Sequence, residues 1–412
     1  MSSSNLVSVV YTPETVYGVT DTPLSAETAY TAIFTSESLS GTPQTTESEA
    51  IRTDRQSGGQ VVTGLTVEGS IDFELAPDKF FDDFFESSMC TTWVASGSSA
   101  ETVDLTPNPS NDQEATLTIG GDFSTIGGGI NANDIIQLLP VSGSPVTLSV
   151  ISVDSTTQLT VATKRGEDAI SGGSFTVLRP QYLDIGIEEK SFTIGKAYKD
   201  VRVSPGDVDE YSQTYTGELV SGFSLSMTSG EIVTGSYNML GNGYDQVTPS
   251  YEQSIVAAGG TVTPPGTSNA LNASVDVPVV TADGEATTWC LQSLTLELDN
   301  GLDPQLCIGK IAPQRYALGQ ASISISADIY LSETSYIDFM PAKLTQNPVS
   351  LSVSTLNAGG GYAFVLSAVQ LTFPDPASTG RNQQTFLNAQ GVAKVGTNGE
   401  SALRIYKLSG DQ

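Results

Sequence analysis

The chain has 412 residues, a formal net charge of −29 and no histidine. Such an acidic surface repels nucleic acid and excludes duplex binding through phosphate contacts, and the lack of imidazole excludes histidine-dependent nucleophiles and histidine metal sites. The 40 glycines, the many Ser and Thr residues and the near absence of long helical periodicity predict an all-β protein in two or three domains.

The three cysteines, Cys90, Cys290 and Cys307, are too few for a disulfide scaffold, and their odd number favours a reducing compartment. The first residues, MSSSNLVSVVYTPE, lack the basic and apolar regions of a signal peptide. The sequence has no run of about 18 apolar residues, so we expect no membrane span.

Residues 1–30 predict an N-terminal arm with one edge strand at Leu6–Tyr11. Residues 31–75 predict a long hairpin whose polar connection, 41–60, is about 20 residues long, a length that is uncommon unless the loop is functional or disordered. This connection carries Arg52 and Arg55. It is either a mobile solvated flap or a segment that becomes ordered on a partner, and we favour the second interpretation.

A strand followed by an aromatic helix comes next. Apolar residues alternate up to Leu75, and the segment Pro77–Met89 predicts a short helix. Its phenylalanines cover one face and are expected to pack on a sheet as core, whereas Asp82, Asp83 and Glu86 are expected to face solvent. The four core residues are Phe80, Phe81, Phe84 and Phe85.

The same pattern occurs a second time, 256 residues later. Ser70 matches Ser326, Asp72 matches Asp328, and Tyr336 and Ile337 stand opposite Phe80 and Phe81 as core of a second, shorter helix. The hairpin block matches at an offset of 260, which places Lys310 and Arg315 in a second loop, 301–320. These matches predict an internal duplication.

The duplication defines the expected domains. The first copy comprises 1–90 with 183–244, interrupted by 91–182, whose five predicted short strands are enough for a small closed β-module. Residues 245–270, with two adjacent prolines, predict a linker, and 271–412 form the second copy. The expected fold class is all-β with one short helix per main domain, as tandem β-sandwich or barrel domains plus an inserted module.

No catalytic constellation is visible. The sequence lacks a Walker loop, a GxSxG elbow and a nucleotide fingerprint after a strand. A carboxylate pair for glycoside hydrolysis cannot be selected among 46 acidic residues, and only Trp93 and Trp289 could line a sugar cleft. We therefore expect no enzyme, no cofactor and no metal site.

The hairpin Ala32–Leu75, the helix Pro77–Met89 and the strand pair GFSLSM…IVTGSYNMLG together resemble the major tail tube proteins of long-tailed, siphovirus-like bacteriophages. The resemblance implies β-sandwich domains with a helix on the flank, assembled as stacked six-domain rings around a channel. A chain with two such domains implies a trimeric, pseudo-hexameric ring with an acidic lumen.

The resemblance also implies the partners and the location. The chain would bind copies of itself and the tape measure, tail terminator and tail tip proteins, and genomic DNA would pass through without specific binding or any membrane contact. It would assemble in the host bacterial cytoplasm and reside in the virion tail, with the insertion outside as a decoration or host-surface contact. The hairpin loops would reach the adjacent ring through Glu47, Glu49, Arg52, Arg55, Lys310 and Arg315.

Two other classes of protein fit the residues. One is another β-rich virion component, such as a tail-tip or capsid decoration protein. The other is a secreted or surface β-sandwich adhesin, against which the missing signal sequence argues.

Overall fold

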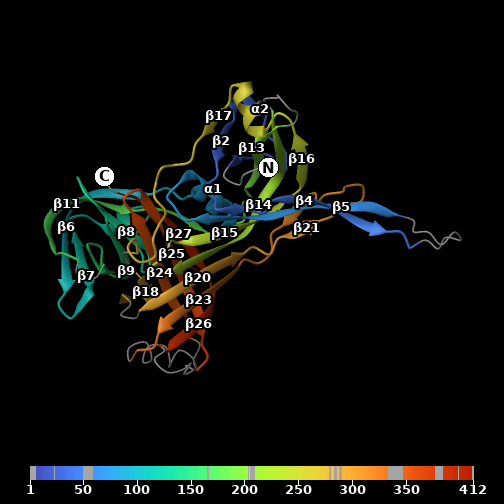
Figure 1. Ribbon diagram of the computed structural model, residues 1–412. Helices are drawn as coiled ribbons and strands as arrows, with labels where there is room; N and C mark the ends of the chain where they lie inside the picture. The colour runs from blue at the N-terminus through green and yellow to red at the C-terminus, as the bar shows by residue number, and fades with distance from the viewer. Residues whose placement is uncertain are drawn as a thin grey trace.

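A computed structural model describes residues 6–410 apart from 23, 50–58, 165–166, 203, 205–208, 278–279, 283–284, 287–289, 333–346, 376–383 and 398. Strands dominate this part of the chain, which contains two α-helices and the short 3-10 turns Leu24–Ala26 and Phe123–Thr125. The all-β fold is therefore confirmed (Figure 1). Neither helix is long and apolar enough to cross a membrane.

The first set of strands builds the middle and top of the molecule in Figure 1. Its longest member, β14, pairs with β13 and β16 along its first half and with β15 along its second half. β15 pairs with β5, and β5 pairs with β4. The set consists of β1 Val7–Pro13, β2 Thr28–Thr31, β3 Ser36–Glu37, β4 Ser40–Glu47, β5 Gln60–Glu74, β12 Gln181–Asp184, β13 Ser191–Arg202, β14 Glu210–Thr228, β15 Thr234–Gly241 and β16 Gly243–Val247.

The second set repeats this pairing. β25 pairs with β24 and β27 along its first half and with β26 along its second, β26 pairs with β23, and β23 pairs with β20. Its strands are β18 Val280–Ala282, β19 Glu285–Ala286, β20 Leu291–Asp299, β21 Asp303–Gln305, β22 Arg315–Ala317, β23 Ser322–Tyr330, β24 Val349–Asn357, β25 Gly360–Thr372, β26 Phe386–Lys394 and β27 Leu403–Leu408. Two copies of one topology are what an internal duplication produces.

The register differs from the one that the sequence match implies. Ser36 pairs with Asp72, but the residue matched to Ser36, Leu296, pairs with Ile325 and not with Asp328. The offset of 260 is therefore wrong by three residues in the first hairpin strand. Short strands of Ser, Thr and acidic residues carry too little side-chain identity to fix a register.

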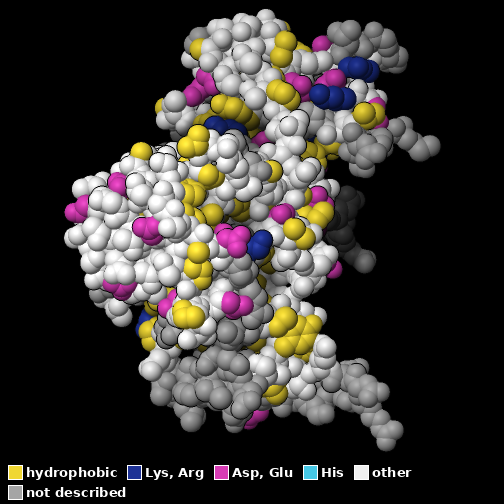
Figure 2. Space-filling view, turned by 90° about the vertical axis from the view of Figure 1, so that its left-hand side faces the viewer, with side chains coloured by type: hydrophobic (Ala, Val, Ile, Leu, Met, Phe, Trp, Pro, Cys, Tyr) yellow, Lys and Arg dark blue, Asp and Glu magenta, His cyan; other side chains and the backbone are white. Residues whose placement is uncertain are grey.

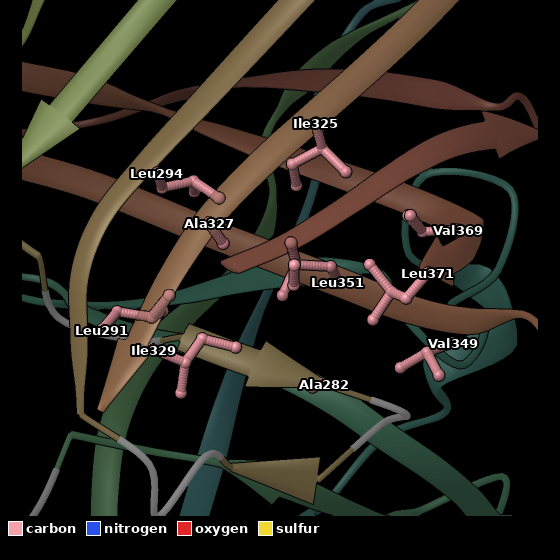
Figure 3. A pocket seen from close by; sticks show the side chains of 11 residues that line it. Ala282, Leu291, Leu294, Ile325, Ala327, Ile329, Val349, Leu351, Val369 and Leu371 are labelled. Atoms are coloured by element: carbon pink, nitrogen blue, oxygen red, sulfur yellow. The ribbon is translucent and has the colours of Figure 1, made fainter. Parts of the chain in front are cut away.

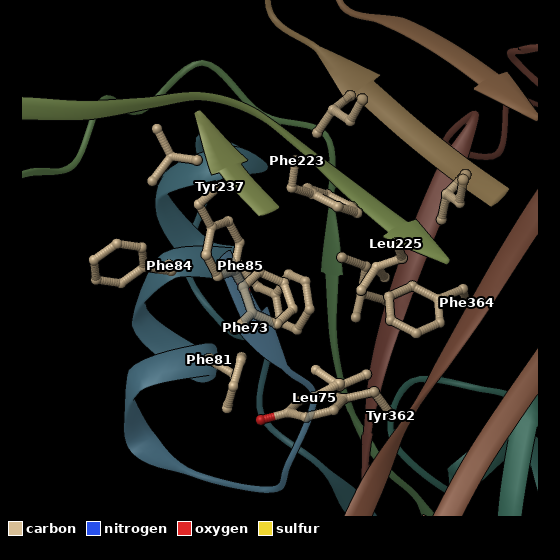
Figure 4. Packing of buried hydrophobic residues seen from close by; sticks show 14 of the residues in the cluster. Phe73, Leu75, Phe81, Phe84, Phe85, Phe223, Leu225, Tyr237, Tyr362 and Phe364 are labelled. Carbon is tan, nitrogen blue, oxygen red and sulfur yellow. The ribbon is translucent and has the colours of Figure 1, made fainter. Parts of the chain in front are cut away.

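Helix α1, Lys79–Ser88, lies between the two sets of strands. Asp78 caps it by accepting a 2.8 Å hydrogen bond from the Phe80 amide. All four phenylalanines are fully buried, as expected. Phe85 contacts Phe223 and Tyr237 of the first set and Tyr362 and Phe364 of the second (Figure 4).

The expectation that Asp82 and Asp83 face solvent is wrong. Their exposed fractions are 7% and 5%, because the second set of strands covers Asp82 and the first set covers Asp83. Asp82 accepts hydrogen bonds from the Tyr362 hydroxyl at 3.0 Å and from the Lys407 ammonium at 2.6 Å. Asp83 accepts a hydrogen bond from Tyr11 and pairs with Lys79. Tyr336 and Ile337, the expected second helix core, lie outside the described residues.

The stretch 91–182 contains six strands that close into a barrel around a core of its own. Its first strand is the one that the sequence did not predict, because Asp104, Pro107 and several Ser residues interrupt its apolar pattern. The strands are β6 Gly97–Asn108, β7 Asn111–Ile119, β8 Ile135–Pro140, β9 Val146–Ser155, β10 Gln158–Ala162 and β11 Ile170–Arg179.

The barrel packs on the second set of strands. The buried Asp134 carboxylate accepts hydrogen bonds from Arg404 Nη1 at 2.9 Å and from the Tyr406 hydroxyl at 2.7 Å. Gln137 hydrogen-bonds the backbone N and O of Ser409. A module inserted in the first copy is thus bound to the second.

Residues 245–270, predicted as a linker, instead contain a helix and a strand. α2, Tyr251–Ala258, begins at a capping box of Ser250 and Gln253 and ends at Gly259, whose φ of 94° requires glycine. β17, Thr261–Thr263, then pairs in parallel with β2. The sequence contains the capping-box pattern S-x-x-Q at Ser250–Gln253, but the prolines and glycines around it favoured the interpretation as a linker.

Two strand pairs, β12 with β27 and β14 with β20, join the two sets into one continuous sheet. β14 and β20 form the longer of these contacts. They pair from Gly222–Asp299 to Thr228–Ser293, and we call this contact the seam. Below the seam, the second set encloses a small apolar cavity of about 30 Å³ lined by Leu294, Ile325 and Leu351 (Figure 3).

Replacing Phe85 with Ala should lower the free energy of unfolding by about 3–5 kcal/mol, because it leaves a cavity where both sets of strands meet α1. Urea unfolding followed by near-UV circular dichroism measures this loss. Val256→Ala, at an exposed position on α2, is the control and should change stability by less than about 0.5 kcal/mol. Equal stabilities of the two variants would contradict the described packing.

Candidate functional site: a polar sheet face and a hairpin arm

The continuous sheet has one apolar and one polar face, because apolar and polar residues alternate along β5 from Leu65, along β20 from Leu294 and along β23. The apolar face packs on the core. The polar face presents mainly Ser, Thr, Asn and Gln, together with acidic residues that we call the acidic row. These are Glu68, Asp72, Glu74, Glu297, Asp299 and Asp328.

Neutral donors hold four of these carboxylates. The Gly301 amide donates to Asp299 at 2.9 Å, and serine hydroxyls hold the other three. Ser293 Oγ donates to Asp328 at 2.9 Å, Ser324 Oγ donates to Glu297 at 3.3 Å, and Ser36 Oγ donates to Asp72. No salt bridge joins the acidic row to Lys or Arg in the part of the chain that the structure describes. The neighbouring strands β4, β5, β15, β14, β20, β23, β26 and β25 together contain one basic residue, Lys394 on β26. The face is therefore anionic and offers almost no cation to a phosphate.

A hairpin projects from the body at the right of Figure 1. β4 and β5 pair from Ser40–Glu68 to Glu47–Gln60, so the predicted 20-residue connection is partly strand. Glu47 and Glu49 lie exposed near its far end. Arg52 and Arg55 lie outside the described residues.

The second loop lies against the first hairpin. The Leu65 amide donates a 2.6 Å hydrogen bond to the Ile311 carbonyl, and β21 pairs with β22. Tyr316 is buried and donates to the Gly241 carbonyl at 3.1 Å. β4, the first part of β5 and the loop 303–317 thus form one projection, which we call the hairpin arm.

The two basic residues predicted for assembly in the second loop differ in their surroundings. Arg315 donates two hydrogen bonds to Glu189 of the same chain, at 2.8 and 3.0 Å, whereas Lys310 is exposed. Arg315 therefore helps to fix the hairpin arm to the body.

The hairpin arm also exposes aliphatic side chains, which sequence reasoning missed because it attended to charge. Figure 2 shows that hydrophobic side chains also reach other parts of the surface, so only their grouping is informative. Val61 and Ile311 are each 62% exposed, and Ile308 is fully exposed. Val62 and Leu306 are exposed too. Solvent-exposed aliphatic residues gathered on one projection mark an interaction surface, and the pair Val61–Val62 inside a polar hairpin was a signal that could have been read.

A buried carboxyl group lies where the hairpin arm joins the body. Glu218 on β14 is fully buried, and its oxygens have no hydrogen-bond partner among the described residues. Burial, and secondarily the nearby Glu14, raise the pKa of Glu218 well above its usual value. Glu14 itself accepts hydrogen bonds from the Gly217 amide and the Ser191 hydroxyl.

The family model described as "Phage tail tube protein" matches residues 4–393, which is nearly the whole chain. A search of the curated proteins found no match to this chain.

Glu218→Gln should stabilise the protein increasingly as pH rises. The folded state binds the Glu218 proton more tightly than the unfolded state, so wild-type stability is fully present below the unfolded pKa and declines as pH rises toward the folded pKa. The advantage of the variant should grow by about 1.4 kcal/mol per pH unit within that window. Urea unfolding at several pH values measures the slope. Glu188→Gln, at an exposed site, should leave the slope unchanged, and equal slopes for both variants would contradict the assignment.

Proposed function

Because the chain belongs to the phage tail tube protein family, and is therefore a structural component of the virion tail, we propose that three copies close into a ring and that rings stack into the tube through which the genome leaves. The observation that carries the proposal is the seam. It joins the two copies of the repeated topology within one chain.

The seam supports a ring because each chain has the two edges needed to repeat it. In the seam, β20, the first hairpin strand of the second copy, pairs with β14 of the first copy. The corresponding strands are β3 and β4 of the first copy and β25 of the second. Among the described residues, β4 pairs only with β5, so its other edge is open. β24 pairs with β25 only as far as Val369, so residues 370–372 of β25 pair with β26 on one side and, within the described part of the chain, have an open edge on the other. Joining these edges between chains makes a head-to-tail contact, which closes when the rotation permits.

Six repeats from three chains match the ring that the family resemblance implies. The continuous sheet would then line the channel with its polar face, since its other face is the core. The acidic row would repel phosphates at close range, because charges act over a Debye length of about 8 Å at physiological salt. DNA would slide past hydroxyl groups and water without being held.

The hairpin arm would connect successive rings. It projects from the body, exposes aliphatic residues and lies at the end of the strands that would line the channel. The tape measure, terminator and tip proteins are the partners proposed for the channel and the two tube ends, in a siphovirus-like tail assembled in the host cytoplasm. The barrel would lie outside the tube.

Purified protein should form hollow tubes of even diameter with threefold symmetry in end-on electron micrographs.

Deleting residues 43–58 should leave a folded protein that forms no extended tubes, because half of the hairpin arm is lost. Deletion of the exposed barrel turn 142–144 is the control and should not affect tube formation. A protein that stays monomeric under all conditions would refute the proposed function, and normal tubes from the first deletion would refute the role of the hairpin arm.

The double variant Glu297→Lys, Asp299→Lys should assemble but slow genome ejection, because it places cations on the proposed channel wall. Added salt should restore the rate, since phosphate contacts weaken as salt rises. Ejection from particles carrying the variant, followed by dye fluorescence over time, measures the rate. Asp154→Lys, on the exposed barrel surface, is the matched control. Equal ejection rates for the two proteins would remove these residues from the channel.

A further inference from the structure

A groove of about 320 Å³ opens at the end of the seam where β14 finishes and β20 begins. Its apolar lining comes from β14, from residues 273–280, and from the start of β20, with Val353 at its side. The apolar lining residues are Met227, Ala273, Val277, Val280, Leu291, Leu294 and Val353. Cys290 also lines the groove and is exposed.

The groove and the hairpin arm lie at opposite ends of the same strand. The groove includes Leu291, the first residue of β20, and the second loop of the hairpin arm follows directly after its last residue, Asp299. Nine residues of strand separate the two by about 30 Å at roughly 3.3 Å per residue. Figure 1 shows β18 at one side of the molecule and the hairpin arm at the other. The arm of a chain therefore cannot occupy the groove of that chain.

Both surfaces carry apolar side chains. The hairpin arm presents exposed aliphatic residues together with the exposed Lys310 and the exposed acidic residues Glu47 and Asp303. The groove mixes its apolar residues with polar ones such as Ser229, Ser274 and Gln292. The segments around it, 227–235 and 271–294, contain acidic residues but no Lys or Arg. Glu231 and Asp276 lie in the two segments, which are hydrogen-bonded to each other through the Ala273 amide and the Glu231 carbonyl.

We propose that this groove receives the hairpin arm of a second copy in the next ring. This inference rests on the proposed function and adds the receiving surface. A projection at one end of a strand and its receptor at the other give a contact that does not close on itself. Such a contact repeats as an open filament along the strand direction.

The native cysteines test the proposal without any substitution. Cys307 is exposed on the hairpin arm and Cys290 is exposed in the groove, whereas Cys90 is buried. In assembled tubes, a short bis-maleimide should join Cys307 of one chain to Cys290 of the next and give a ladder of covalent multimers on denaturing gels. Cys307→Ser and Cys290→Ser should each abolish the ladder while tubes still form.

The outcomes distinguish the receiving surface from the tube itself. Tubes without a ladder, or a ladder that survives Cys290→Ser, would place the hairpin arm elsewhere and leave the tube function intact. Absence of tubes would overturn both.

A second variant examines the groove itself. Ala273→Trp fills the groove and should raise the protein concentration needed for tube growth about tenfold, equivalent to about 1.4 kcal/mol of lost association energy. Val141→Trp, at an exposed position on the barrel, is the matched control and should leave that concentration unchanged. Near-UV circular dichroism establishes folding of both, and an unchanged critical concentration for Ala273→Trp would exclude the groove.

Discussion

The burial of α1 between the two sets of strands is the constraint on which the rest of the structure depends. A helix on the flank of one sandwich would keep its acidic face in water. Here that face is covered, and Asp82 must be compensated by Tyr362 and Lys407 from the second copy. Burial raises the pKa of Asp82 even though Lys407 opposes the shift. A buried carboxylate with specific partners fixes where the second copy sits, because any other placement would leave the charge unpaired.

Three further contacts hold parts of the chain in fixed positions relative to one another. The seam aligns the two copies strand to strand, Tyr316 and Arg315 fasten the second loop to the first copy, and Asp134 fastens the barrel to the second copy. Each contact joins segments far apart in the sequence. The relative orientation of the copies, and with it the curvature of any sheet they continue, is thereby built into the single chain before assembly.

The sequence predicted what local pattern determines. The all-β class and the burial of Phe80 and Phe85 were legible because alternating apolar residues and an aromatic helix face are strong local signals. The burial of Asp82 was not legible, because its partners stand 280 and 325 residues away. The slip of three residues in the first hairpin strand has a similar cause, since Ser36 and its neighbours pack against little that selects a register. The capping box at Ser250 was a local signal that composition obscured. The aliphatic residues of the hairpin arm were visible, but only the fold shows that Val61 and Ile308 share one projection.

The hairpin arm combines one loop from each repeat, so a chain with two related domains carries one arm and not two. The barrel likewise occurs once. A tube built from such chains would present its interior as six near-equivalent sheet segments, while its layer-to-layer contacts and its outer surface would repeat only three times per turn of the ring. The genome and the neighbouring tail proteins would thus meet different symmetries in the same object, and a helical reconstruction of it would resolve side chains only if threefold averaging replaced sixfold.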